Sequence, residues 1–163
     1  MKKVRCLLLT NSVKHSLACV AGIDLESKKW LRIVENENGD AIKYYKYLRK
    51  KNGYKVSIEE RIKNKFPLPL IVEFDILREV PKNTQPENVI IDNEIRIIKK
   101  IDIDNLIEFE EYPYDLWGSS NAVLYDENLN LNSLFLIEVS KIKLYYKDRS
   151  AFGHNPQRRG IFW

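Results

Sequence analysis

Short strand-like segments separated by turn-forming residues restrict the fold of this 163-residue chain more than any other feature. Each segment alternates apolar and polar residues or is rich in β-branched residues, and each is too short for an ordinary amphipathic helix. Such runs lie at Lys3–Thr10, Leu17–Asp24, Trp30–Val34, Leu70–Leu77, Leu134–Val139 and Ile142–Tyr146. Val89–Lys99 is predicted to form two short strands around Asp92-Asn93, and a further strand is expected to begin at Ile161.

Helix signals are fewer and confined to two regions. Ala41–Lys51 has helical composition and ends at Asn52-Gly53, a typical helix stop. Ser57 and Glu60 have the spacing of a capping box, which predicts a helix over Ile58–Lys65. Asp104 is expected to cap a third helix that runs through Glu110.

Many short strands with one to three short helices indicate a mainly β protein built as small barrels, not a sandwich or a doubly wound sheet. An apolar content of 44% is sufficient for a core. No Ser- or Gly-rich linker occurs, so two subdomains would be packed together. The apolar runs are shorter than a membrane span or a signal sequence. We therefore expect a cytoplasmic protein that has no membrane partner.

Positive charge is concentrated in residues 43–65, which hold nine Lys or Arg against Glu59 and Glu60. Four tyrosines interleave with these cations. Cations that follow a phosphate backbone and aromatic rings that stack on bases are typical of a single-strand binding surface. The alternative is a solvated helix whose tyrosines pack on the core. The candidate binding residues here are Lys46, Arg49, Lys50 and Lys51.

Four motifs in the same order resemble those of the bacterial dual OB-domain proteins, from residue 4 to residue 163. The first is CLLLTNSVKHSLACVAGIDL followed by WLRIV, and the second is QPENVII. The third is SSNAVLYDE followed by SLFLIEVSKIKL, and the fourth is the arginine pair of QRRG. The segment Lys43–Pro69 does not match the family pattern, so the basic stretch gains no support from the resemblance.

The resemblance implies two packed OB-like barrels that bind nucleic acid or a nucleotide, often in anti-phage or other conflict systems. We expect the first barrel within residues 1–99, with a basic helical insertion at about 41–66. A linking helix and the second barrel would occupy 100–163. The family pattern continues past the arginine pair, so the second barrel is expected to be incomplete here. Its open edge would then favour a homodimer.

A polar cluster follows the first predicted strand and is expected to form a binding loop. Lys14 and His15 are predicted to contact a ligand, with Lys14 facing phosphate. Asn11 either reads a base edge or, together with Ser12, fixes the turn through backbone hydrogen bonds.

Other candidate residues are scattered along the chain. Arg32 shares a strand face with Trp30, where it either binds phosphate or pairs with a carboxylate. Gln85, Glu87 and Asn88 are interpreted as capping a turn or bridging the barrels. Three more residues are candidates for anion contacts: Asn121, Arg158 and Arg159.

Catalytic patterns are weak, and the sequence favours a binding module over an enzyme. Cys6 and Cys19 are interpreted as free thiols, because no paired Cys or His spacing suggests a metal site. No cofactor is predicted. Glu26-Ser27-Lys28 imitates half of a nuclease site without an upstream aspartate other than Asp24. The expected partner is single-stranded RNA or DNA, or a nucleotide. The alternatives are a protein–protein adaptor and, third, a metal-dependent nuclease.

Overall fold

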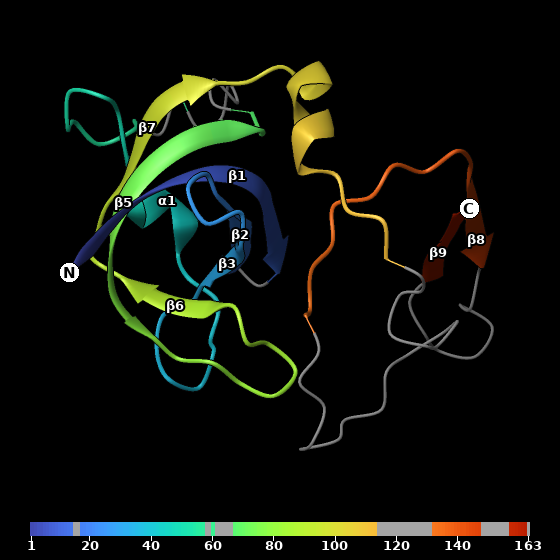
Figure 1. The fold of residues 1–163 in the computed structure, drawn as a ribbon, viewed down its shortest axis with the longest axis horizontal. Helices are drawn as coiled ribbons and strands as arrows, with labels where there is room; N and C mark the ends of the chain where they lie inside the picture. Colours follow the sequence, from blue (N-terminus) through green and yellow to red (C-terminus); the bar gives the residue numbers. More distant parts are fainter. Residues whose placement is uncertain (15–16, 58–59, 61–66, 114–131, 148–156, 163) are drawn as a thin grey trace.

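The computed structural model describes residues 1–14, 17–57, 60, 67–113, 132–147 and 157–162. Its N-terminal part is a closed five-stranded barrel (Figure 1). The barrel strands are β1 (Lys2–Lys14), β2 (Leu17–Asp24), β3 (Trp30–Ile33), β5 (Leu70–Glu79) and β6 (Asn88–Ile91). They neighbour one another in the order β1-β2-β3-β6-β5, and pairing of β5 with β1 closes the ring.

The long strand β1 makes this closure possible because it takes part in two ladders. Its first half pairs antiparallel with β5, from Lys2 opposite Ile76 to Leu8 opposite Leu70. Its second half continues the ladder with β2, with a register shift between Leu8 and Thr10. Bulges of this kind bend a strand and increase its twist, which lets one strand serve two sides of a barrel.

The seam of the barrel is the parallel pair β3–β6. Arg32 lies opposite Asn88, and Ile33 lies opposite Val89. A strand order with one parallel pair between otherwise antiparallel neighbours needs a long crossover, and the segment between β3 and β6 provides it. This closed, mainly β barrel is consistent with the OB fold that the sequence predicted.

The prediction of two short strands around Asp92-Asn93 is confirmed. β6 ends at Ile91, and β7 (Ile95–Lys100) resumes along the same edge of β5. A further short strand, β4 (Leu48–Arg49), joins β7 in parallel.

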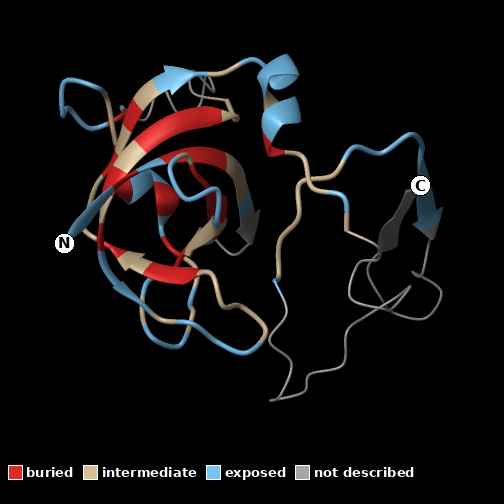
Figure 2. Ribbon diagram, viewed as in Figure 1, coloured by how far each residue is buried: buried red, intermediate tan, exposed pale blue. Residues whose placement is uncertain are grey.

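Strand alternation divides the apolar residues between two cores. Val4, Cys6 and Leu8 of β1 point into the barrel, where they join the larger buried cluster. Figure 2 shows in red the buried stretches of the barrel strands. Leu7 points outward into a second cluster with residues of β2 and β5. Phe109, at the end of the 3-10 helix η1 (Ile103–Phe109), covers this outer cluster. The helix predicted from Asp104 to Glu110 is therefore present in position, but Asp104 lies in its first turn and is not its cap.

The helix predicted over Ala41–Lys51 is wrong beyond a single turn. The helix α1 spans Tyr44–Tyr47, and Leu48 then adopts an extended conformation. Burial explains the early end, because Tyr44 and Tyr47 are buried in the inner core and Leu48 enters β4 beside Ile95.

The capping box is confirmed in its hydrogen bonds. The backbone N–H of Ser57 donates to Glu60 Oε2 at 3.0 Å, and the N–H of Glu60 donates to Ser57 Oγ at 3.2 Å. Of the predicted helix Ile58–Lys65, Glu60 is helical and the rest lies outside the described residues.

The binding loop predicted after the first strand is strand through Lys14. Asn11 to Lys14 continue β1 opposite Val20 to Leu17, because the hairpin ladder satisfies their backbone groups. Residues 15–16, between these two strands in the sequence, lie outside the described part of the chain.

The strand predicted over Leu134–Val139 is also wrong. Both backbone groups of Leu136 are instead hydrogen-bonded to Glu111. The Leu136 carbonyl accepts from the N–H of Glu111 at 2.7 Å, and the Leu136 N–H donates to Glu111 Oε2 at 2.9 Å. Farther on, β8 (Ile142–Lys147) and β9 (Gln157–Phe162) form an antiparallel hairpin outside the barrel (Figure 1). Within the described ranges there is one barrel and this hairpin, so packing of two barrels is not confirmed. No helix in those ranges is long and apolar enough to span a membrane.

Candidate nucleic-acid interface

The predicted phosphate contacts of the basic segment divide into two kinds. Arg49 lies 3.5 Å from Glu94, and its side chain is only 12% exposed. Lys50 lies 2.8 Å from Glu60, which lowers the pKa of Glu60 to about 2 through that contact and the bonds to Ser57. These two cations are already paired within the protein. They are therefore poor candidates for contacts to a phosphate backbone.

Lys46 and Lys51 are both exposed. The Lys46 ammonium lies 6.0 Å from the centroid of the Tyr47 ring, and no described carboxylate pairs with either lysine. Of the four predicted cations in this segment, these two remain available for phosphate.

The tyrosines of the basic segment divide in the same way. Tyr44 and Tyr47 are buried, whereas Tyr54 is 71% exposed. Burial and the Glu35 carboxylate, which accepts from Tyr47 Oη at 2.7 Å, raise the pKa of Tyr47 to about 12. The interpretation as core-packed tyrosines holds for these two rings.

Asn11 lies at a barrel-interior position. It pairs with Val20 of the inner core, and its amide is close to the buried hydroxyl of Tyr44. Burial raises the pKa of Tyr44, the neighbouring Tyr45 adds to this, and the Asn11 amide opposes it. Asn11 therefore lies in a strand and contacts Tyr44, and it does not have the turn-fixing position that the sequence offered as one alternative.

Arg32 and Trp30 share the outer face of β3, as the alternation predicted. The indole Nε1 of Trp30 donates to Glu111 Oε2 at 2.8 Å, which fixes the ring orientation. Arg32 is partly exposed, and no described carboxylate pairs with its guanidinium. Arg32 is therefore available to an anionic ligand.

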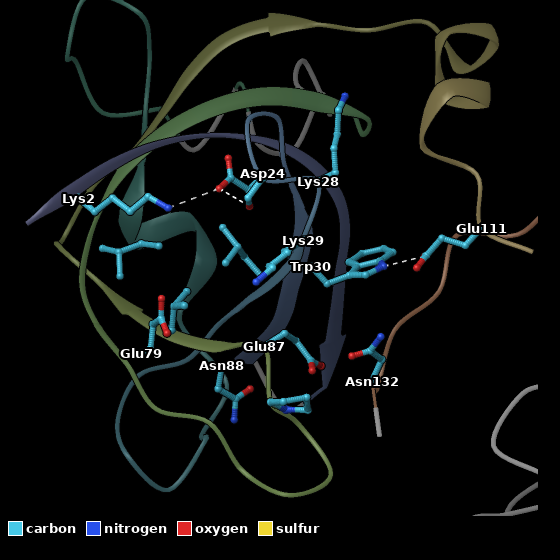
Figure 3. A pocket seen from close by; sticks show the side chains of 15 residues that line it. Lys2, Asp24, Lys28, Lys29, Trp30, Glu79, Glu87, Asn88, Glu111 and Asn132 are labelled. Atoms are coloured by element: carbon cyan, nitrogen blue, oxygen red, sulfur yellow. Dashed lines mark hydrogen bonds and ion pairs between the residues drawn. The ribbon is translucent and has the colours of Figure 1, made fainter. Parts of the chain in front are cut away.

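A cleft of about 550 Å³ lies beside this strand (Figure 3). Its walls come from the start of β1, the β2–β3 turn, β3, the start of β6 and the extended segments at Glu111 and Asn132. At one side Asp24 accepts from Ser27 Oγ at 2.7 Å and lies 3.8 Å from Lys2. Burial opposes the charge of Asp24, but these partners and the N–H of Glu26 outweigh it and hold the pKa of Asp24 below its usual value.

Glu87 and Asn88, from the turn motif Gln85–Asn88, are among the residues that line this cleft. Asn88 is 1% exposed, and its Nδ2 donates to Gln85 Oε1 at 3.4 Å. Glu87 Oε1 accepts a short hydrogen bond from Ser133 Oγ. The sequence interpretation offered turn capping or bridging of two barrels; the bond between Asn88 and Gln85 lies within the turn, and bridging of two barrels stays a prediction. Sequence reasoning did not predict the cleft, although Glu87 and Asn88, two polar residues directly after Pro86, were a usable signal.

For three of the remaining predicted residues, the structure gives the position in a strand. Lys14 ends β1, and Arg158 and Arg159 lie in β9 opposite Tyr146 and Tyr145. His15 and Asn121 lie outside the described residues. Cys6 and Cys19 are free thiols, as predicted. In the described part of the chain, no group of three His, Cys, Asp or Glu side chains is placed to hold a metal ion.

Comparison with known proteins gives one match. The family model described as the dual OB-containing domain matches residues 4–163. No curated protein and no solved structure matches the chain.

Proposed function

The chain belongs to the dual OB-containing domain family, and on that premise we propose that it binds single-stranded nucleic acid or a nucleotide on its N-terminal barrel. OB barrels commonly bind oligonucleotides across their second and third strands and the adjoining loops. The observation that carries the proposal is the cleft beside β3, which brings a fixed tryptophan, polar groups and lysines together at that face.

Cations without a described carboxylate partner occur on β3 and, separately, in the basic segment. Arg32 on β3 lies on the outer face together with Trp30, and neither Lys46 nor Lys51 pairs with a described carboxylate. Cations without internal partners can neutralise phosphates, while a rigid aromatic ring provides a stacking surface. We place the protein's role in sensing or targeting within a bacterial defence or regulatory system, with any effector activity supplied by a partner.

The first experiment is fluorescence polarisation with single- and double-stranded RNA and DNA of equal length, measured from 50 to 300 mM salt. Single-stranded ligands should bind more tightly, and log K should fall linearly with log salt. The same samples are incubated with Mg²⁺ and examined on a gel, where intact ligand is expected. Absence of binding to all four ligands would refute the proposal, and Mg²⁺-dependent cleavage would reassign the protein as a nuclease.

Paired variants then test which cations contact the backbone. In single-stranded complexes each phosphate contact contributes about 0.7 to the slope of log K against log salt. Replacing Lys46 and Lys51 by Gln should flatten the slope by about 1.4, whereas replacing Arg49 and Lys50 should change it far less. Equal effects of both pairs would contradict the division drawn from the Glu94 and Glu60 contacts.

A protein–protein function is the second candidate, because β8 exposes large apolar side chains. Ile142 is 60% exposed, Leu144 is 76% exposed and Tyr146 is 65% exposed. Exposed apolar strands tend to pair with another chain. Sedimentation should reveal a dimer that Leu144→Glu converts to a monomer. A wild-type monomer at all concentrations would remove self-association through β8.

A further inference from the structure

One carboxylate joins the barrel to the C-terminal part of the chain at the cleft beside β3. Glu111 Oε2 accepts from Trp30 Nε1 at 2.8 Å and from the backbone N–H of Leu136 at 2.9 Å. The backbone N–H of Glu111 also donates to the Leu136 carbonyl at 2.7 Å. The orientation of a barrel side chain and the position of a distant backbone segment therefore depend on the same residue.

Residues 132–136, termed the docking segment below, contact the barrel at two further points. Ser133 Oγ donates a hydrogen bond to Glu87 Oε1. Leu136 packs against the outer cluster formed by Leu7 and its buried neighbours, and Trp30 packs against the same cluster. An apolar side chain, a hydroxyl group and the Glu111 carboxylate thus hold the docking segment in one place on the barrel.

These contacts build part of the cleft wall. Trp30 lines the cleft from the barrel, whereas Glu111 and Asn132 line it from outside the barrel (Figure 3). The cleft volume of about 550 Å³ lies inside the range of about 300–1,000 Å³ found for small-molecule sites, so a ligand that fills it touches both sides. If the docking segment left the barrel, the cleft would lose Asn132 and Glu111 would lose its two hydrogen bonds to Leu136.

A ligand that touches both sides favours the docked arrangement. A ligand shifts a conformational equilibrium only by the difference in its affinity for the two states. Here the docked state offers the ligand an additional wall and an indole whose orientation is already fixed by Glu111. Because such coupling is reciprocal, docking strengthens binding by the same factor by which the ligand strengthens docking.

We propose that Glu111 is a positioning residue that couples the cleft to the C-terminal part of the chain: docking of residues 132–136 orients Trp30 through Glu111, and a ligand in the cleft tightens that docking. The inference rests on the proposed function, because the ligand is the nucleic acid proposed to bind there. It adds a route by which binding on the N-terminal barrel changes the C-terminal part of the protein.

The first test needs no ligand. Leu136→Ala weakens the apolar contact of the docking segment, and Leu136 is not among the described residues that line the cleft. Hydrogen exchange of the Trp30 indole N–H, followed by NMR and assigned with Trp30→Phe, should accelerate about fivefold. Ser133→Ala loosens the same segment by removing its bond to Glu87, and it should accelerate this exchange too.

Leu9→Ala is the matched control for the first test. Leu9 packs against the same outer cluster as Leu136, but it belongs to β1. This variant should leave the exchange rate of the Trp30 indole unchanged. Equal acceleration in Leu9→Ala and Leu136→Ala, or no acceleration in either docking-segment variant, would overturn the positioning role.

The second test adds the single-stranded RNA or DNA that binds most tightly by fluorescence polarisation. At saturation it should slow hydrogen exchange of the Leu136 amide at least fivefold, roughly the lower end of the usual coupling between two sites. The amide of Asp92 is the control, since it is bonded to the Asp75 carbonyl in the turn between β6 and β7. Neither of these two residues is among those that line the cleft, and the Asp92 amide should keep its rate.

Variants of Glu111 then separate positioning from charge. Removing a negative charge would by itself strengthen binding of a phosphate backbone. Glu111→Ala should nevertheless weaken the oligonucleotide at least fivefold, because Trp30 and the Leu136 amide lose their acceptor. Glu111→Gln loses the same charge but keeps an acceptor oxygen, and it should bind at least as tightly as the wild type.

The outcomes separate this inference from the proposed function. If the oligonucleotide binds without slowing exchange at Leu136, or if Glu111→Ala binds as tightly as Glu111→Gln, the coupling is wrong and nucleic-acid binding stands. Faster exchange at Leu136 on binding would overturn the inference, because the ligand would then displace the docking segment. If no oligonucleotide binds, the proposed function is wrong and its coupling to docking falls with it, whereas the indole exchange rates still decide whether docking positions Trp30.

Discussion

Replacing Gly22 by alanine should destabilise the barrel severely, because the space for a Cβ atom is already filled. Gly22 lies in β2 opposite Leu8, just before the register shift of β1. An added Cβ would overlap the carbonyl oxygen of Leu7, and it would lie 2.9 Å from the carbonyl carbon of that residue and 2.7 Å from Cys6 Sγ. Ordinary carbon contacts are longer than 3.4 Å. The two strands would have to separate at the point where β1 passes from one ladder to the other.

The expected cost is about 3 kcal/mol, at the upper end of the usual range for overpacked cores. For a chain of this length it corresponds to a drop in melting temperature of roughly 10 °C. Gly53→Ala is the control. Gly53 has a φ of +85°, and no described atom lies within 4 Å of the position that its Cβ would take. Gly53→Ala should therefore be destabilised only by the cost of placing alanine in a left-handed backbone conformation, about 1 kcal/mol.

Thermal and urea unfolding followed by circular dichroism would measure both variants. A second comparison, Gly22→Ala in a Cys6→Ala background, distinguishes the two sources of overlap. The cost should persist there, because the closest neighbour of the added Cβ is the Leu7 backbone and not the cysteine sulfur. A Gly22→Ala protein that melts within about 2 °C of wild type, or no lower than Gly53→Ala, would refute the close approach of β1 and β2.

Three further predictions concern single contacts. The pKa of Asp24 is lowered in the folded protein, so its contribution to stability is complete above the unfolded pKa near 3.9 and is lost as the pH falls through the folded pKa. The melting temperature of Asp24→Asn should therefore depend less on pH between 6 and 3 than that of the wild type, and parallel curves would contradict this. Cys19 is partly exposed, whereas Cys6 is buried and its pKa is raised by that burial. A thiol reagent should therefore modify one cysteine in the native protein and two in urea, and equally fast reaction of both cysteines in the native protein would be inconsistent with the barrel. Glu111→Ala removes the acceptor for Trp30 Nε1 and for the Leu136 N–H. Hydrogen exchange of the Leu136 amide should accelerate at least tenfold, because the lost hydrogen bond to a charged group contributes about 1.5 kcal/mol or more, whereas the control Glu110→Ala should leave this exchange rate unchanged.

The barrel was predictable because its strands carry their signal locally. Leu17–Asp24 is a strand with the bounds that the alternation gave, and the break at Asp92-Asn93 separates two strands as expected. The local pattern failed where tertiary contacts decide the backbone. Leu134–Val139 is apolar enough for a strand, but Glu111 occupies the backbone groups of Leu136. Helical composition at Ala41–Lys51 was likewise overridden by the burial of Tyr47 and the entry of Leu48 into β4.

The charged site was less predictable, because charge density along the chain does not show which cations have partners. Arg49 and Lys50 stand in the most basic segment, yet both pair with carboxylates. Arg49 pairs with Glu94, which follows β5 in the sequence, and Lys50 pairs with Glu60, ten residues later. Arg32, in a neutral apolar run, has no described carboxylate beside it. Availability for phosphate therefore depends on the carboxylate partner of each cation, and Arg32 is as good a candidate as Lys46 and Lys51.

The position of the cleft follows from how the barrel closes. The β3–β6 seam pairs two residues on each strand, whereas β1 and β2 pair over eight. Parallel pairing is also the less stable arrangement per residue, and one of the two β6 residues in this ladder is the buried polar Asn88. Asn88 is at this point, buried by Gln85 and the turn around Gly39 but supplied with one hydrogen bond where its amide can make several. A barrel closed by apolar residues alone would be easier to stabilise. The cleft therefore borders the shortest ladder of the barrel, where a buried amide takes the place of an apolar side chain.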